Sequence, residues 1–235
     1  MNLKGRLKLI YDMIPQCDIL CDIGTDHALI PAYALLNNRC RRAIATDVRQ
    51  GPLERAKRTL RAYNLEGLME LRRGDGLEPI SLEEADVIVM AGMGGLLITR
   101  LLADQIEKAR RARRIIIQPM HAQELIRPFL WEHGFAVTDE AIAREGKKLY
   151  QVMSVVYDET KSASCRKSPL YAVIGEGLVK KRDPLLKDWL CDRIKKQRKR
   201  VEGLKASART YPGLEGEERL LYDMEALMDS LFGHM

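Results

Sequence analysis

Strand-like and helix-like segments alternate along the first 160 residues of this 235-residue chain. The strand-like segments are short and apolar, and they cover residues 17–23, 42–48, 69–77, 85–95 and 113–120. Strands that alternate with helices form a parallel sheet with helices on both faces. Residues 135–159 then have the pattern of a hairpin with its turn near Gly146, which adds antiparallel strands at one side of the sheet. The sequence therefore predicts an α/β domain over residues 1–160.

The last third of the chain has a different pattern. The polar stretch 160–169 suits a linker. Apolar residues then recur at steps of three, four or seven in two stripes, separated by the turn-forming stretch 210–217. The stripes are Leu186, Leu190, Ile194, Val201 and Leu204, and then Leu221, Met224, Leu227, Met228 and Leu231. They predict two helices folded back as an antiparallel coiled-coil hairpin, in a second domain over residues 161–235.

Positive charge is concentrated in the first of these two helices. The chain has a net charge of +6, but residues 180–209 hold 12 Lys and Arg against 4 Asp and Glu, and residues 210–235 hold 1 against 6. The basic stretch could bind a polyanion. Alternatively, the two helices pair their charges and thereby only stabilise the hairpin.

The cysteines and the hydropathy of the sequence indicate the cellular compartment of the protein. The five cysteines are scattered, and no pair has CxxC spacing, which indicates reduced thiols in a cytoplasmic protein without a zinc site. No apolar run approaches the ~20 residues that span a bilayer, and the N-terminus lacks the apolar core of a signal peptide. We therefore expect a cytoplasmic protein with no membrane segment and no metal site.

The stretch CDIGTDHALIP, residues 21–31, has the pattern of a strand end, a turn at Gly24 and a helix start. A dinucleotide loop would have glycine where this chain has Asp26 and Leu29, and no P-loop motif occurs. Asp26 would repel a pyrophosphate by about 4 kcal/mol at ~4 Å and an effective dielectric near 20. S-adenosylmethionine has no phosphate and carries a cationic sulfonium and ammonium, so it fits an acidic loop better. The alternative is that Asp22 and Asp26 only cap the helix.

Two further acids follow the next predicted strands. Asp47 ends the second strand, where a carboxylate commonly holds ribose hydroxyls. Asp75 and Gly76 lie in GDG after the third strand, well placed for an adenine amino group or the ribose rim. Because the carboxyl ends of parallel strands meet at one edge of the sheet, we expect these residues to lie close together.

The fourth and fifth predicted strands end in VIVMAGMGG and IIIQPM. Gly92, Met93 and Gly94 would let a cofactor or a base approach the backbone, unless the glycines only form a tight turn. Gln118 could hydrogen-bond a base edge, or it is an ordinary strand end. His27 either caps its helix or faces the pocket.

Taken together, CDIGTDHALIP, ATDVRQGPLERA, GDGL, VIVMAGMGG and IIIQPM closely resemble the bacterial TrmK family, over roughly residues 1–160. The tail resembles that family's coiled-coil domain in layout. Where the family commonly has Ser, this chain has Thr25, and Met120 stands where a polar residue would be expected after Gln-Pro. The resemblance implies a Rossmann-like class I methyltransferase domain with a C-terminal helical coiled-coil hairpin.

The resemblance also implies methyl transfer from S-adenosylmethionine to N1 of an adenosine in tRNA. Adenine N1 has a lone pair, so catalysis could come mainly from positioning. Asp26 and Gln118 are the catalytic candidates, with Asp26 stabilising the cationic product or accepting a proton from N6. The cofactor would be bound by Asp22, Gly24, Asp26, His27, Asp47, Asp75, Gly76, Gly92, Met93 and Gly94.

The basic helix would grip the tRNA backbone, with Lys195, Lys196, Arg198 and Lys199 as the candidate contacts, in a monomeric enzyme. Arg72, Arg73 and residues 110–114 would extend that surface, unless they are solvated surface charges. Two alternatives remain. One is a methyltransferase of a protein or small molecule, and the other is a non-catalytic RNA-binding module.

Overall fold

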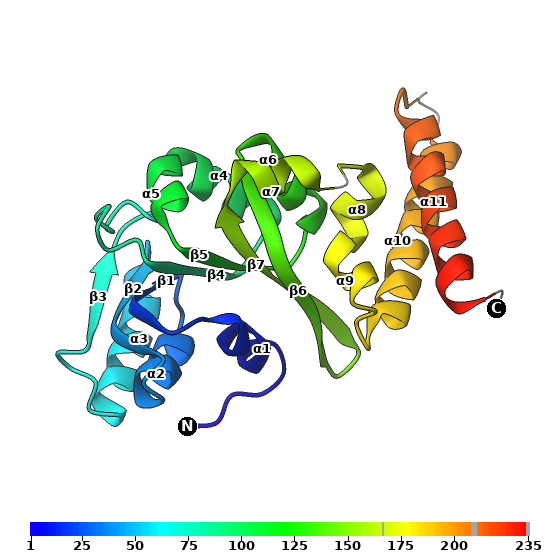
Figure 1. Cartoon of the computed structure of the whole chain (residues 1–235). Coiled ribbons are helices and arrows are strands. Elements are labelled where there is room, and N and C mark those ends of the chain that lie inside the picture. Colours follow the sequence, from blue (N-terminus) through cyan, green and yellow to red (C-terminus); the bar gives the residue numbers. More distant parts are fainter. Residues whose placement is uncertain (166, 208–210, 234–235) are drawn as a thin grey trace. The chain divides into compact units, whose positions relative to one another are not determined.

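The computed structural model of the chain describes residues 1–165, 167–207 and 211–233. The chain divides into two compact units, residues 1–165 and residues 166–235. The first unit contains a seven-stranded sheet in the order β3-β2-β1-β4-β5-β7-β6 (Figure 1). Its strands are β1 (Cys17–Ile23), β2 (Cys40–Asp47), β3 (Met69–Arg73), β4 (Val87–Met93), β5 (Arg114–Pro119), β6 (Phe135–Glu145) and β7 (Lys148–Tyr157).

Strands β1 to β5 are parallel, and β7 and β6 close the sheet as an antiparallel hairpin. Gly146 lies in the hairpin turn with φ +58°, as the sequence predicted. The chain order reverses between β1 and β4, and this crevice beyond the carboxyl ends of the strands is where α/β sheets bind ligands. The predicted α/β fold of the Rossmann-like methyltransferase type is confirmed.

Helices cover both faces of the sheet (Figure 1). One face carries α1 (Gly5–Met13), α2 (Leu29–Leu36) and α3 (Gln50–Ala62), and the other carries α4 (Gly95–Asp104), α5 (Ile106–Arg111), the short 3-10 turn η1 (Gln123–Leu125) and α6 (Ile126–Glu132). Helix α7 (Glu159–Ser164) contacts α6 and β6.

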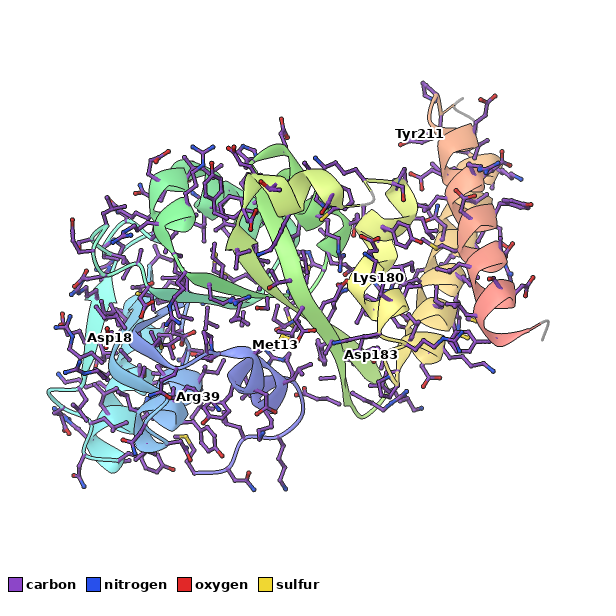
Figure 2. The ribbon with its side chains drawn as sticks, in the orientation of Figure 1. Met13, Asp18, Arg39, Lys180, Asp183 and Tyr211 are labelled. Carbon is purple, nitrogen blue, oxygen red and sulfur yellow. The ribbon has the colours of Figure 1, made fainter. Side chains whose placement is uncertain are left out.

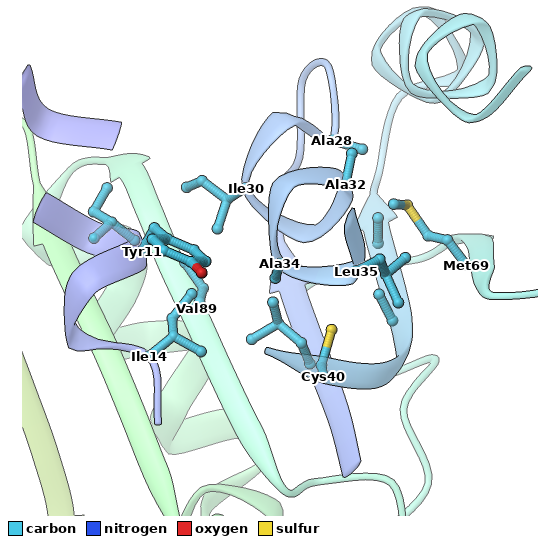
Figure 3. Packing of buried hydrophobic residues seen from close by; sticks show 14 of the residues in the cluster. Tyr11, Ile14, Ala28, Ile30, Ala32, Ala34, Leu35, Cys40, Met69 and Val89 are labelled. Carbon is cyan, nitrogen blue, oxygen red and sulfur yellow. The ribbon is translucent and has the colours of Figure 1, made fainter. Parts of the chain in front are cut away.

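Strand β4 illustrates how consecutive apolar residues pack alternately against the helices on the two faces of the sheet. Val87 and Val89 pack into the core beneath α1 and α2, whereas Ile88 and Met90 pack into the core beneath α4 and α6. Figure 3 shows Val89 among residues of α1, α2 and the neighbouring strands. Fully burying such an aliphatic side chain contributes about 1.5–3 kcal/mol, so both faces of each central strand favour this arrangement.

Several elements differ from the sequence prediction. Helix α1 was not predicted, and the helical stretch after β4 is divided into α4 and α5 at Gln105, which has φ −132°. The connection from β3 to β4, residues 74–86, contains no regular helix. Arg72 on β3 anchors this connection, because its guanidinium donates to both carboxylate oxygens of Glu84 at 2.7 Å.

The second unit is helical. Its elements are α8 (Pro169–Ile174), α9 (Glu176–Lys180), α10 (Leu186–Ala206) and α11 (Leu214–Phe232). Lys180 and Asp183 mark the α9–α10 junction, and Tyr211 precedes α11 (Figure 2). Helices α10 and α11 form the antiparallel pair that the two stripes predicted, because Arg198 contacts Glu225 while Lys205 contacts Glu218.

Only some of the predicted stripe residues form the buried core of this helix pair. Leu186, Leu190, Val201, Met224 and Met228 are buried, whereas the other stripe residues are half-buried. Trp189 is also buried, and its indole N–H donates to the carbonyl of Ile174 on α8 at 3.2 Å. Of the predicted linker 160–169, residues 160–164 belong to α7, Pro169 begins α8, and position 166 lies outside the described residues. Position 210 of the predicted turn also lies outside them, and α11 already begins at Leu214.

Candidate active site

A cleft of about 610 Å³ lies at the carboxyl ends of strands β1 to β4. Nine of the ten predicted cofactor residues line it, and they are Asp22, Gly24, Asp26, His27, Asp47, Asp75, Gly76, Gly92 and Met93. Gly94 does not line the cleft, and neither does the predicted catalytic residue Gln118. Helix α1 contributes Arg6 and Leu7 to the wall.

The loop after β1 presents one buried and one exposed carboxyl group. Asp22 is buried, and burial raises its pKa to about 6, against the lowering effect of a hydrogen bond with Thr25. Gly24 has φ +72°, and a Cβ atom there would lie 3.1 Å from the sulfur of Met93. Helix α2 begins at Leu29 and none of the described side chains caps it; its N-cap residue is Ala28, whose N–H donates to the hydroxyl of Thr25 at 3.1 Å. The alternative that Asp22 and Asp26 cap this helix is therefore excluded.

Asp26 lies at the rim of the cleft and already has partners. Its carboxylate accepts from Arg55 Nε on α3 at 2.6 Å and lies 3.5 Å from Nε2 of His27. Sequence reasoning assigned Asp26 a free negative charge facing the cofactor. In the structure the guanidinium of Arg55 compensates that charge.

The acid at the end of β2 and the acid just after β3 also differ in exposure. Asp47 is buried, and its carboxylate accepts from the backbone N–H of Arg49 at 2.7 Å. Asp75 is exposed, and its carboxylate pairs with Arg100 of α4 at 2.9 Å. Gly76 has φ +57°, and a Cβ atom there would lie 2.5 Å from Leu101, so this turn packs tightly against α4.

The glycines of AGMGG have two separate roles. Gly92 has φ +78° and lies at an irregularity in the β4–β5 register, facing the cleft. A Cβ atom on Gly94 would lie 2.3 Å from the His121 ring, and one on Gly95 would lie 2.0 Å from the carbonyl oxygen of Ala122. Gly94 and Gly95 therefore serve the tight turn, because the absence of their side chains lets the 121–122 segment pack against the start of α4.

Gln118 is fully buried and its amide is already hydrogen-bonded. Its side-chain oxygen accepts from Arg6 Nη1 at 2.9 Å and from the backbone N–H of Gly92 at 3.2 Å. Its amide nitrogen donates to the carbonyl of Pro119 at 2.7 Å. Gln118 was expected to contact a base edge, but it does not line the cleft; it contacts Gly92 and Arg6, which do.

Sequence reasoning did not single out the arginines around the site. Arg6, Arg55 and Arg100 come from α1, α3 and α4 and contact Gln118, Asp26 and Asp75, respectively. They lie far from these partners in the sequence, and although Arg55 falls within ATDVRQGPLERA, nothing in that stretch indicated its contact with Asp26. The helical pattern of residues 5–13 was the one signal that could have brought Arg6 into consideration.

The predicted RNA-binding residues lie on α10 in the helical unit. Lys195, Lys196, Arg198 and Lys199 are all exposed. Lys196 pairs with Asp192 at 2.9 Å and Arg198 pairs with Glu225 of α11 at 2.5 Å. No carboxylate lies within 4.0 Å of the Lys195 or Lys199 ammonium groups in the described part of the chain. Charge pairing therefore accounts for Lys196 and Arg198 but not for Lys195 and Lys199, for which binding of a polyanion stays a prediction.

The other basic residues proposed for the RNA surface are mostly engaged within the catalytic unit. Arg72 is bound to Glu84, and Arg73 donates to the carbonyl of Val48 at 3.1 Å. In the run 110–114, Arg110 pairs with Glu107, Arg113 with Asp86, and Arg114 donates to the hydroxyl of Thr138.

None of the described helices has the length and hydropathy of a membrane span. Across residues 1–165, 167–207 and 211–233, no three His, Cys, Asp or Glu side chains gather as metal ligands would. Cys17, Cys21 and Cys40 are buried thiols outside any disulfide.

Comparison with known proteins agrees with this site. The model of a methyltransferase domain family matches residues 3–153. The tRNA (adenine(22)-N(1))-methyltransferase of Bacillus subtilis is 40% identical over 154 residues, which are 65% of this chain and 64% of that protein.

Two solved structures match almost the whole chain. The B. subtilis tRNA methyltransferase TrmK is 30% identical with a TM-score of 0.83, over 97% of this chain and 98% of that chain. A Streptococcus pneumoniae protein in complex with S-adenosyl-L-methionine is 25% identical with a TM-score of 0.84, over 97% and 100%. This chain therefore belongs to the TrmK family of methyltransferases.

Proposed function

We propose that this protein transfers a methyl group from S-adenosylmethionine to N1 of an adenine in tRNA. The observation that carries the proposal is the acidic cleft at the ends of β1 to β4, in a chain that matches TrmK over almost its full length. The name of the B. subtilis relative specifies adenine 22, and we propose the same position here.

The cleft fits S-adenosylmethionine better than a phosphorylated cofactor. Asp22 and Asp47 are buried at two neighbouring strand ends, where a pyrophosphate would be repelled. Asp47 would hold the ribose hydroxyls, Asp75 and Gly76 would face the adenine, and Asp22, Gly24 and Gly92 would surround the methionine moiety. When bound, the cofactor supplies an electrophilic methyl group on a sulfonium.

The acceptor chemistry requires little from the protein beyond positioning. The N1 lone pair of adenine forms a bond to the methyl carbon while the bond from that carbon to sulfur breaks and its electrons stay on sulfur. The methylated base then carries the positive charge. We propose that Asp26, at the exposed rim of the cleft, stabilises that charge or accepts the N6 proton. Gln118 acts as a positioning residue that holds Gly92 in place.

The helical unit would supply sequence-independent affinity for tRNA. Lys195 and Lys199 are exposed and lack a carboxylate partner among the described residues, so they are the charges most available to phosphates. We further propose that the protein acts as a monomer, which light scattering at micromolar concentration would test.

Methyl transfer to two tRNA transcripts tests the proposal. One transcript has adenosine at position 22, and the other is identical except for guanosine there. We expect transfer of labelled methyl groups to the first transcript only. Equal labelling of both would refute the proposed position, and labelling of neither would point to a protein or small-molecule acceptor.

A further inference from the structure

Arg6 is one of three arginines in the wall of the cleft, which also contains four aspartates. It lies on α1 and lines the cleft beside Gly92, with its Nη1 atom 3.9 Å from where a Cβ atom of Gly92 would be. Its guanidinium carbon lies 5.4 Å from the centre of the Tyr150 ring, which limits where the side chain can point.

The charge of Arg6 is not compensated by any described carboxylate. Two other arginines line the cleft, and each has an acidic partner, since Arg49 lies 3.6 Å from Asp47 and Arg55 pairs with Asp26. Across the described residues, no carboxylate oxygen lies within 4.0 Å of the Arg6 guanidinium. Glu145 accepts from the backbone N–H of Arg6 at 2.8 Å.

The guanidinium also has donor capacity to spare. Its one hydrogen-bond partner among the described residues is the neutral side-chain oxygen of Gln118 at 2.9 Å, and its Nε atom is buried without a partner. A half-buried guanidinium of this kind favours an anionic ligand, because a charge-assisted bond would compensate a charge partly removed from water.

The order of the strands indicates which end of the cofactor reaches Arg6. Asp75, Asp47 and Asp22 follow or end β3, β2 and β1, which are successive strands of the sheet, and β4 with Gly92 comes next. With the ribose at Asp47 and the adenine towards Asp75, the methionine moiety must extend towards β1 and β4. That moiety carries the only anionic group of S-adenosylmethionine.

We propose that Arg6 binds the carboxylate of the methionine moiety of S-adenosylmethionine. The inference rests on the proposed function for its ligand and extends it to a residue outside the predicted motifs. Helix α1 is then a cofactor-binding element, and the buried Gln118 serves to hold the guanidinium of Arg6 and the N–H of Gly92 at the same end of the cleft.

Calorimetric titration of the full chain with two ligands tests this assignment. The ligands are S-adenosylmethionine and its decarboxylated analogue, which keeps the sulfonium and the ammonium. We expect Arg6→Ala to weaken binding of S-adenosylmethionine about 10- to 100-fold and to leave binding of the analogue unchanged within about twofold. Arg6→Lys should give an intermediate loss, because it keeps the charge without the planar fork.

Lys4→Ala is the matched control, since it removes one positive charge from the start of the same helix without touching the cleft. An equal loss for both ligands in Arg6→Ala would overturn the proposal, because Arg6 would then act only through Gln118 and Gly92. Unchanged binding of both ligands with weaker tRNA binding would also overturn it and assign Arg6 to an RNA phosphate. If the unmodified protein binds neither ligand, the proposed function itself fails.

Discussion

The side-chain oxygen of Gln118 accepts a hydrogen bond from the backbone N–H of Gly92 at 3.2 Å, so β5 fixes the glycine turn at the end of β4. The same oxygen accepts from Arg6. One buried amide therefore connects three elements around the cleft.

Gln118→Leu should lower the free energy of unfolding by about 1–3 kcal/mol, because it removes the acceptor of the Arg6 guanidinium and of the Gly92 N–H and places an apolar side chain beside them. It should also weaken binding of S-adenosylmethionine. Denaturant unfolding and calorimetry measure the two effects. Gln16→Leu, at an exposed glutamine outside the cleft, is the control and should change neither. A Gln118→Leu variant of unchanged stability would contradict the role of this bond.

Asp22 should make cofactor binding depend on pH. Burial raises its pKa to about 6, so the carboxylate that would face the ammonium is lost as the pH falls through 6. Affinity for S-adenosylmethionine should then fall up to about tenfold per pH unit below 6, and Asp22→Asn should abolish this dependence. A pH-independent dissociation constant between pH 5 and 8 would count against the assignment.

The Asp22 carboxyl group should also affect the free energy of unfolding, with the opposite dependence on pH. Because the folded-state pKa of Asp22 lies above its unfolded value near 3.9, folding favours the protonated form. Its contribution to stability is fully present below pH ~4 and is lost as the pH rises through 6. Without cofactor, Asp22→Asn should therefore be more stable than the unmodified protein at pH 8, by about 1–3 kcal/mol, with little difference at pH 4.

Asp47→Ala should weaken binding of S-adenosylmethionine about 10- to 100-fold, because it removes the buried carboxylate that we propose accepts hydrogen bonds from both ribose hydroxyls. Asp75→Ala should have a smaller effect, since Asp75 is exposed and already paired with Arg100. Asp18→Ala, at the opposite end of β1, serves as the control. An unchanged dissociation constant for Asp47→Ala would remove Asp47 from the ribose site.

Replacing Lys195, Lys196, Arg198 and Lys199 together should weaken tRNA binding and leave cofactor affinity intact. Lys195→Glu with Lys199→Glu should account for most of the loss and reduce the salt dependence of binding, because these two charges lack carboxylate partners among the described residues. Arg198→Ala should have a smaller effect, since Arg198 is paired with Glu225. Filter binding over a salt series would measure both, and a larger loss in Arg198→Ala would contradict this ranking.

The sequence predicted the strands and the acidic strand ends because those features are local. Alternating burial on β4 and the glycine turn at Gly24 depend on a few consecutive residues. The ten predicted cofactor residues all lie in such stretches, and nine of them line the cleft.

What the sequence did not reveal are partners that are distant along the chain. Asp26 and Gln118 were predicted to act on the ligand, and the structure adds that Arg55 and Arg6, 29 and 112 residues away, contact them. Arg72 was considered either as an extension of the RNA surface or as a solvated charge, and in the structure Glu84 binds it. Residue type and spacing do not reveal such pairs, because they arise only when helices and connections pack against the sheet.

Identification of the methylated nucleoside tests the central claim most directly. Unmodified tRNA would be incubated with the protein and labelled S-adenosylmethionine, digested to nucleosides and examined by mass spectrometry with chromatographic standards. The account predicts 1-methyladenosine as the labelled product. Label in N6-methyladenosine or in another nucleoside, or no label in a protein that binds the cofactor, would contradict it.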